Sequence, residues 1–411
     1  MTVDEPRRAG VAVALATVSI DAIGVGIIFP VMPDLLLSLG LEDIGEAALW
    51  GGALATLYAL MQFLCSPLLG ALSDRFGRRM VMLCSLAAMA IDYAILSVAG
   101  GLWVLLVGRA VAGAAGATYG TATAYIADVS KPADRARRFG LVGAVFGLGF
   151  VLGPALGGAV GELHVRAPFM LAALMAAINF ALAVVFLRES LPLSRRRAFD
   201  WRRANPLGAM RRALGLPALR WLLVGYFLFA LGNHVYPVIW GYWSKYTFEW
   251  SVGTIGLSLA TYGIAVALVQ GVLIRPSVSW LGEARTVAGG LVIGAMVAVG
   301  FAFIDAGWMA FALTPIAALS DLATPALTGL MANRVGDDEQ GELQGVLASL
   351  MAVASVLAPP MASGLFYRFT ANDAAWHLPG APFLMSAVLI ALAIPLMWRS
   401  LFPRLPSPDC D

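Results

Sequence analysis

Apolar stretches long enough to cross a membrane follow one another along almost the whole of this sequence. A helix needs about 20 mostly apolar residues to cross the hydrocarbon core of a bilayer, and twelve such stretches can be counted here. Only 13% of the 411 residues are charged and 60% are hydrophobic, whereas a soluble protein carries about 25% charged residues. We therefore predict an all-α membrane protein with twelve transmembrane helices. We expect the first helix to be retained, because its apolar run reaches Pro33 without the small-residue cleavage site of a signal peptide.

The breaks between these stretches divide the positive charges unevenly. An even number of spans places both termini on one side of the membrane, and 23 of the 27 Lys and Arg residues lie on that side. Three lie on the opposite side, and Arg109 lies within a span. Because cytoplasmic loops carry the excess of Lys and Arg, we predict that both termini are cytoplasmic.

The sequence repeats itself weakly at a constant offset of 205 residues. The offset pairs Leu54-Ala55-Thr56 with Leu259-Ala260-Thr261, Gly77 with Gly282, Gly140 with Gly345, and Pro154 with Pro359. Transporters built from two six-helix halves show such symmetry and place the substrate between the halves near the midplane. We predict an N-terminal bundle over residues 1–190, a cytoplasmic linker over 191–219 and a C-terminal bundle over 220–411.

The linker region is the one long break between spans, and it combines many arginines with apolar residues such as Trp201 and Leu207. Two interpretations remain open: a solvated linker, or a helix that lies on the inner leaflet of the membrane. Asn205-Pro206 is a suitable start for such a helix near Leu207.

The loop after the second span reads Gly70-Ala-Leu-Ser-Asp74-Arg75-Phe-Gly77-Arg78-Arg79. Its glycines permit a tight turn, and Asp74 can accept amides at a helix N-terminus or pair with Arg78. A loop that merely anchors the positive side would explain the arginines but neither Asp74 nor the glycines. The loop resembles the signature loop of the major facilitator superfamily, which implies the major facilitator fold with two pseudo-symmetric six-helix halves. The resemblance further implies a charge cluster of Asp74, Arg75, Arg78 and Asp128 that holds the outward-open state.

Two further spans carry motifs. The fourth has Arg109 with Gly113, Gly116 and Gly120 on one face, so the arginine should face the bundle interior while the glycines admit a neighbouring helix. An interfacial arginine is the alternative.

The fifth span has Gly149, Gly153 and Gly157 at intervals of four, followed by Gly158, and these glycines would form a smooth groove beside Pro154. Small-residue packing alone could require that groove. The two motifs resemble the proton-transfer and antiporter motifs of drug exporters in the superfamily.

Ionisable and polar side chains occur near the middle of several spans, and a charge in lipid is costly unless it serves a purpose. They are Asp21, Asp92, His234 and Asp321, together with Gln62, Asn179 and Gln270. A carboxyl group that leaves water holds its proton more tightly, so it can exchange protons near neutral pH. For Asp92 the alternative is a structural pair with Arg109. For Asp21, His234 and Asp321 together a wet central cavity is the favoured interpretation. Gln62, Asn179 and Gln270 either line the same cavity or each form a hydrogen bond between helices.

The chain as a whole resembles the tetracycline/proton antiporters, through stretches such as Asp21–Pro33, Tyr58–Phe63, Gly108-Arg109 and Gln340–Gly345. The resemblance implies substrate or proton roles for Asp21, Gln62, Asp92, Arg109 and Gln270. The family has a histidine in the eighth helix and an aspartate in the ninth, where this chain has Val266 and Gly294. We hypothesise that His234 and Asp321 supply the missing groups.

The sequence thus predicts a proton-coupled drug exporter of the bacterial inner membrane that works by alternating access. The exported species in the family is tetracycline chelated to a divalent cation, and an exporter or proton symporter of another small molecule is the alternative. We expect no resident cofactor or metal, no nucleic-acid partner and a monomer. The chain lacks the His-Glu-x-x-His, Gly-x-Ser-x-Gly and phosphate-binding motifs of enzymes and ATP-driven pumps.

Overall fold

The computed structural model describes residues 5–116, 118–197, 219–336 and 339–402. The first half contains α1 (Glu5–Leu37), α2 (Ile44–Phe76), α3 (Arg78–Val98), α4 (Leu102–Ala115), α5 (Thr118–Val129), α6 (Pro132–Gly161), α7 (Ala167–Phe186) and the short helix η1 (Leu193–Arg195). The second contains α9 (Arg220–Asn233), α10 (Val235–Phe248), α11 (Val252–Leu268), the π-helical η2 (Val269–Leu273), α12 (Ile274–Leu281), α13 (Glu283–Phe303), α14 (Gly307–Ser320), α15 (Ala323–Ala332), α16 (Gln340–Thr370) and α17 (Ala381–Leu401). Most of the predicted linker, with the helix expected near Leu207, lies outside the described residues.

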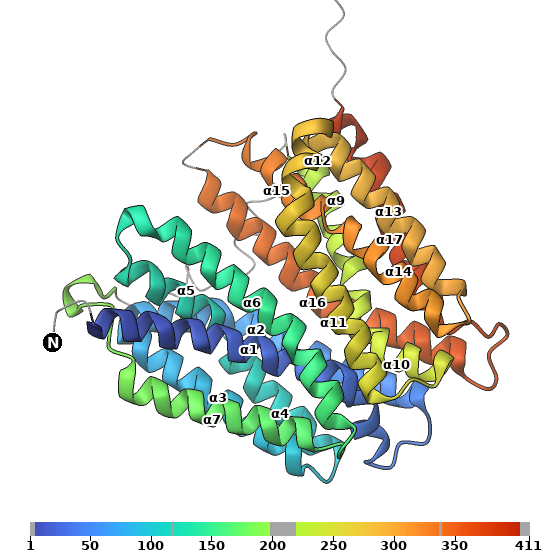
Figure 1. The fold of residues 1–411 in the computed structure, drawn as a ribbon, viewed down its shortest axis with the longest axis horizontal. Coiled ribbons are helices and arrows are strands. Elements are labelled where there is room, and N and C mark those ends of the chain that lie inside the picture. The colour runs from blue at the N-terminus through green and yellow to red at the C-terminus, as the bar shows by residue number, and fades with distance from the viewer. Residues whose placement is uncertain (1–4, 117, 198–218, 337–338, 403–411) are drawn as a thin grey trace, which may run out of the picture. The chain divides into compact units, whose positions relative to one another are not determined.

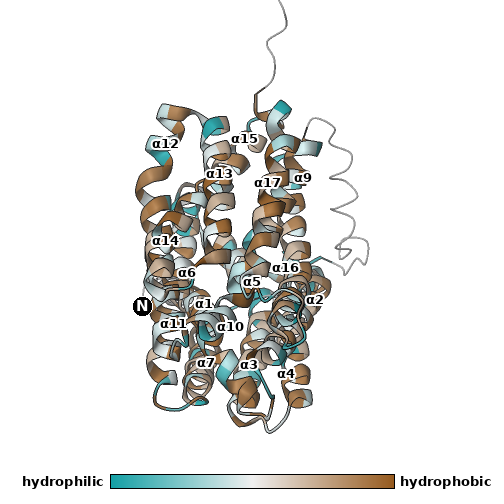
Figure 2. Ribbon diagram, turned by 90° about the vertical axis from the view of Figure 1, so that its right-hand side faces the viewer, coloured by the Kyte–Doolittle hydropathy of each residue, from teal (hydrophilic) through white to brown (hydrophobic). Residues whose placement is uncertain are grey.

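Joined where they run on directly, these helices give twelve candidate membrane spans among the described residues, which confirms the predicted twelve-helix all-α fold. Hydrophobic residues cover the helices along most of their length, as in α13 and α17, whose spans both have a mean hydropathy of 2.1 (Figure 2). Large apolar side chains also remain on the outside, among them Trp103 and Trp308. This distribution suits helices whose outer faces meet lipid rather than water.

Four of the spans are interrupted instead of running as one regular helix. The interruptions separate α4 from α5, α9 from α10, and α14 from α15, while η2 interrupts the span that begins with α11. Gly116 follows α4 and Asp321 follows α14. These two residues are 205 positions apart, the offset of the sequence repeat. A helix interruption therefore occurs at equivalent positions of the two halves.

The chain divides into two compact units. Unit 1 comprises Met1–Pro206 and Trp240–Gly263, and unit 2 comprises Leu207–Ile239 and Ile264–Asp411. In unit 1, α1 packs along α6 and α7, α3 along α7, and α2 along α4 (Figure 1). In unit 2, α17 packs against α9 and α13. By packing, most of α10 and α11 therefore belongs with the first unit, although the predicted halves assign both helices to the second.

Each unit has its own buried apolar core. The core of unit 1 includes Val18, Met82 and Ile126, from α1, α3 and α5. The core of unit 2 includes Phe229, Leu291 and Met397, from α9, α13 and α17. The cores fix the helices that carry the polar groups described next.

Candidate functional site

The turn between α2 and α3 consists of one residue, Gly77, with φ 106° and ψ 153°. Only glycine adopts this region of backbone space readily. The turn places the end of α2 directly beside the start of α3, with Asp74 and Arg78 one helical turn apart. The glycine expected from the signature loop is therefore required by the backbone itself.

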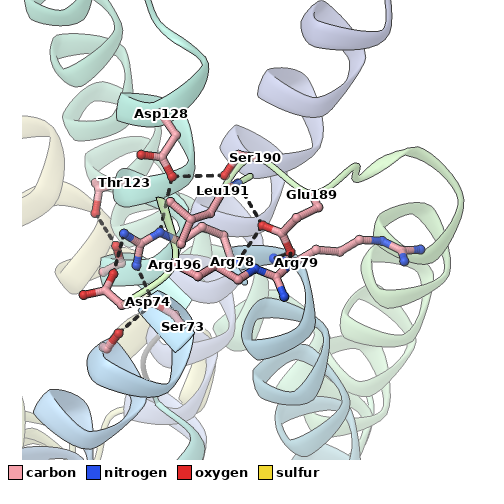
Figure 3. A network of polar contacts seen from close by, with 12 residues as sticks. Ser73, Asp74, Arg78, Arg79, Thr123, Asp128, Glu189, Ser190, Leu191 and Arg196 are labelled. Carbon is pink, nitrogen blue, oxygen red and sulfur yellow. Dashed lines mark hydrogen bonds and ion pairs between the residues drawn. The ribbon is translucent and has the colours of Figure 1, made fainter. Parts of the chain in front are cut away.

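Arg78 lies at the centre of a polar network in unit 1 (Figure 3). Its guanidinium pairs with Asp74, with Nη2 to Oδ1 at 2.7 Å, and with Asp128, with Nε to Oδ2 at 3.3 Å. It also donates a hydrogen bond to the Ser73 hydroxyl, and Ser190 Oγ donates to Asp128 at 3.1 Å. The structure thus brings together three of the four charged residues expected in the cluster.

The fourth residue, Arg75, lies apart from this network. Its side chain is exposed, and its guanidinium carbon lies 5.1 Å from the centroid of the Phe76 ring. Arg75 lies in the last turn of α2, where a cation complements the C-terminal end of the helix. Its place in the charge cluster stays a prediction.

Glu189, which the sequence analysis did not single out, completes the network. It accepts hydrogen bonds from the backbone N–H of Arg78 at 2.9 Å and of Arg79 at 3.3 Å, and it pairs with Arg196 at 3.7 Å. A carboxylate in this place satisfies free amides at the N-terminus of α3 and complements its dipole. One signal was available, since Glu189 closely follows the C-terminal end of α7, where that helix favours a cation.

Arg109 and Asp92 form a second, deeply buried ion pair between α4 and α3. Both residues are buried, with 7% of Arg109 and 2% of Asp92 exposed. Gly108 leaves space for the carboxylate, because a Cβ there would lie 2.9 Å from Asp92 Oδ1. The guanidinium also lies over the Tyr58 ring, 5.5 Å from its centroid. Arg109 therefore faces the interior with a partner, as predicted, and that partner matches the alternative interpretation of Asp92.

Two of the three glycines on the predicted face of the fourth span pack closely against α2. A Cβ on Gly113 would collide with the backbone of Tyr58, and one on Gly116 would lie 3.0 Å from Gln62 Nε2. Gln62 donates from that nitrogen to the Gly116 carbonyl at 3.0 Å. Gly120 has open space beside it, so the close approach does not extend along the whole face.

The glycine groove of α6 holds α1. A Cβ on Gly149 would lie 2.7 Å from Ser19 O, one on Gly153 2.6 Å from Ile23 O, and one on Gly157 2.6 Å from Ile27 O. Asp21 is half-buried and lies on α1, within the segment from Ser19 to Ile27 that packs into this groove. The other two residues of the motif, Pro154 and Gly158, also make contacts. The Pro154 ring lies against Gly26 of α1, and Gly158 faces α11.

The site residues predicted in the second half lie at the helix interruptions. His234 caps α9 and donates from Nδ1 to the Ala230 carbonyl at 2.8 Å. Asp321 caps α14, and Gln270 lies exposed in the π-helical η2. Irregular backbone inside spans is tolerated where it is buried in protein or lines a cavity, and it often marks the sites of transporters. Their transport roles stay predictions.

A sequence model of the Major Facilitator Superfamily matches residues 14–359, and the chain belongs to this superfamily of membrane transporters. Among its relatives, the class C tetracycline resistance protein of Escherichia coli is 40% identical over 95% of this chain and 97% of its own length. The class G tetracycline resistance protein of Vibrio anguillarum is 38% identical over 95% of this chain and 98% of its own length. The crystal structure of the human organic anion transporter MFSD10 (TETRAN) matches with a TM-score of 0.70 and 25% identity, covering 95% of this chain and 99% of that one.

These comparisons confirm the resemblance to the superfamily and to the tetracycline resistance proteins. Together with the twelve spans, they make the chain a multi-pass protein of the bacterial inner membrane.

Proposed function

We propose that this chain is a proton-coupled exporter of tetracyclines or related drugs, not an enzyme, and that it works as a monomer. The observation that carries the proposal is the match to the class C tetracycline resistance protein, at 40% identity over nearly the full length of both chains. The glycine groove of α6 supports it, since that motif is typical of exporters and here holds the helix that bears Asp21.

The proposed mechanism is alternating access. A carboxyl group in a low-dielectric site holds its proton until the surroundings open to water on one side. Asp21 releases its proton toward the cytoplasm, the drug binds, the two halves rock, and protonation from the periplasm expels the drug. The drug and the proton can shift the equilibrium only by the difference of their affinities for the two states.

The buried Asp92–Arg109 ion pair, which joins α3 to α4, supports this scheme. Each member offsets the desolvation of the other, so breaking the pair would leave an uncompensated buried charge. We propose that the pair keeps α3 and α4 together and responds to the protonation state of the site. The proposal needs no resident metal or cofactor, and the substrate arrives as a divalent-cation chelate in the tetracycline case.

A second candidate is export of a different small molecule, and the residues at positions 266 and 294 favour it. Val266 and Gly294 stand where the tetracycline antiporters have a histidine and an aspartate. A Cβ on Gly294 would lie 3.2 Å from the Cβ of Ser320, the residue before Asp321. The three atoms nearest to such a Cβ belong to Ser320 and Ile390 and none is a carboxylate oxygen, so a replacement by Asp321 stays a hypothesis.

Drug susceptibility and transport together test the proposal. An efflux-deficient bacterium would express the wild type, Asp21→Asn and the matched control Asp305→Asn, which alters an exposed acid next to α13. Tetracycline resistance that is lost only in Asp21→Asn supports the proposal. Resistance only to other compounds selects the second candidate. Drug uptake by everted vesicles that ignores a collapsed pH gradient contradicts proton coupling.

A further inference from the structure

Several contacts gather at the end of unit 1 that lies farthest from the signature loop. α2 has 33 residues, so its two ends are about 50 Å apart. Gly77 follows one end, and Asp43 caps the other by accepting the Glu46 N–H at 2.7 Å. Because α1 leads into α2 at the Asp43 end, the last turn of α1 lies there. The ends of α6 and α10 and the start of α11 contact this region, all within unit 1.

The first contact is a close approach of α6 to α11. A Cβ on Gly158 would lie 3.0 Å from both the Gly256 Cα and the Val252 carbonyl oxygen. A Cβ on Gly161 would lie 2.7 Å from Val252 Cγ1. The two helices therefore meet at a distance that leaves no room for larger residues.

The second contact is made by Glu162, the residue that follows α6. An acid at the C-terminal end of its own helix is unfavourable for that helix. Its Oε1 instead accepts the backbone N–H of Gly253 at 2.7 Å, in the first turn of α11. Glu162 thus caps the start of α11, as Glu189 caps the start of α3 at the other end of the unit.

Two hydrogen bonds, first from the Ser251 side chain and then from the Gly253 backbone, lower the pKa of Glu162. A lowered pKa means that the ionised form stabilises the contact. This stabilisation is present above the ordinary pKa of glutamate and is lost as the pH falls through the lowered value. The contact therefore stays charged throughout the neutral range.

The third contact joins α10 to α1 and α2. Lys245 Nζ lies 2.7 Å from Asp34 Oδ1, with 23% and 25% of the two side chains exposed. One turn earlier, the Tyr242 ring packs against Gly51 of α2, where any Cβ would collide with it. The end of α10 and the start of α11 are thereby held to α1, α2 and α6 by one ion pair and one carboxylate cap, with tight packing between them.

We propose that Glu162 is a positioning residue for transport: with the Asp34–Lys245 pair it forms a latch that holds α10 and α11 against α1, α2 and α6 at this end of unit 1 and opens in each cycle. The inference rests on the proposed alternating-access function. Partly exposed charges exchange their partners for water at little cost, so they can release while the glycine contacts ensure a close fit on return.

Cysteine labelling tests the latch in reconstituted protein. Val252 is buried, with 7% exposed, and Val252→Cys in a background with Cys65, Cys84 and Cys410 changed to serine reports on access between α6 and α11. A polar maleimide should label it about fivefold faster when Glu162→Gln weakens the cap. Ser251→Ala, which removes one donor, should give a smaller increase, and Asp305→Asn should give none.

The Asp34–Lys245 ion pair allows a second test in the same labelling experiment. Lys245→Met should also speed labelling, and the exchanged pair Asp34→Lys with Lys245→Asp should restore the slow rate. Labelling at the wild-type rate in both Glu162→Gln and Lys245→Met overturns the latch. If Glu162→Gln does not yield folded protein by size-exclusion chromatography, Ser251→Ala decides in its place. Labelling requires neither drug nor pH gradient, so failure of the proposed drug transport leaves this readout intact.

Discussion

The signature loop and its repeat in the second half have nearly the same backbone but different chemistry. Gly77 has φ 106° and ψ 153°, and Gly282 has φ 79° and ψ 162°. In the first loop the cation Arg78 pairs with Asp128. At the equivalent positions the second loop has an acid and an amide, and Asn333 donates to Glu283 at 3.0 Å.

The comparison separates what the fold needs from what the proposed transport cycle adds. A single-residue turn between consecutive spans recurs in both halves, so it belongs to the fold. Two acids beside the first loop have no counterpart in the second half. Ser279 stands at the position equivalent to Asp74, and Ile394 at the position equivalent to Glu189. The charge cluster is therefore a specialisation of unit 1.

The largest effect is expected from Arg78→Gln, which removes the centre of the cluster. Charge-assisted hydrogen bonds contribute roughly 1.5–3 kcal/mol, so the conformational equilibrium and with it the transport rate should change by about 10- to 150-fold. Transport into everted vesicles measures this. Glu283→Gln is the matched control, because an amide there still accepts from Asn333, and it should stay within about twofold. Equal losses in the two variants would remove the distinction between the loops.

The two glycines should differ in stability when each is changed to alanine. Both turns place a side chain in backbone space that costs about 1–3 kcal/mol for residues other than glycine. A Cβ on Gly77 would also collide with the Glu189 carboxylate, whereas Gly282 has open space. Thermal unfolding in detergent should show the larger loss for Gly77→Ala. The excess should vanish in a Glu189→Ala background, and if it persists, the collision is not its cause.

Glu189→Gln should have a moderate effect. The amide keeps the shape but loses the charge that complements the start of α3, an interaction of about 1 kcal/mol, or roughly fivefold in transport. The everted-vesicle assay measures it, with Asp305→Asn as the control for loss of an acid. A wild-type rate in Glu189→Gln would make this residue a passive neighbour of the cluster.

The smallest effect is expected from building the first loop's pair into the second loop. Glu283→Arg with Asn333→Asp recreates Arg78 and Asp128 at exposed positions, where ion pairs contribute about 0–1 kcal/mol. Transport should remain within about fivefold of the wild type. A large change would show that the second loop also takes part in the conformational equilibrium.

The sequence predicts much of this architecture because its signals are local. Hydropathy locates the spans, and the glycine interval of four locates the groove that receives α1. The Arg109 partner was foreseen only as an alternative, since a burial argument requires a partner without choosing one. The sequence did not predict the roles of Glu189 and Glu162. Their hydrogen bonds to backbone N–H groups join residues 111 and 91 positions apart in the chain, and no local sequence pattern indicates such a contact.

The sequence did not predict the helix interruptions either, for a different reason. Pro325 lacks the N–H that would bond the Asp321 carbonyl and so weakens the helix there, but Pro30, Pro33 and Pro154 lie inside uninterrupted helices, so a proline alone does not locate a break. His234 and Asp321 could be named from their polarity alone, but their place at the ends of α9 and α14 could not. Polarity identified the residues, and the structure added the backbone context.

The matched interruptions at Gly116 and Asp321 also bear on how selectivity can change. A helix end leaves carbonyl groups without intrahelical partners, and in the first half the Gly116 carbonyl accepts a hydrogen bond from Gln62. A hydrogen atom stands there in the first half and a carboxymethyl group in the second. In the proposed transport cycle, a new side chain at position 321 would therefore alter selectivity more readily than one at position 116, where a Cβ would lie 3.0 Å from the Gln62 nitrogen.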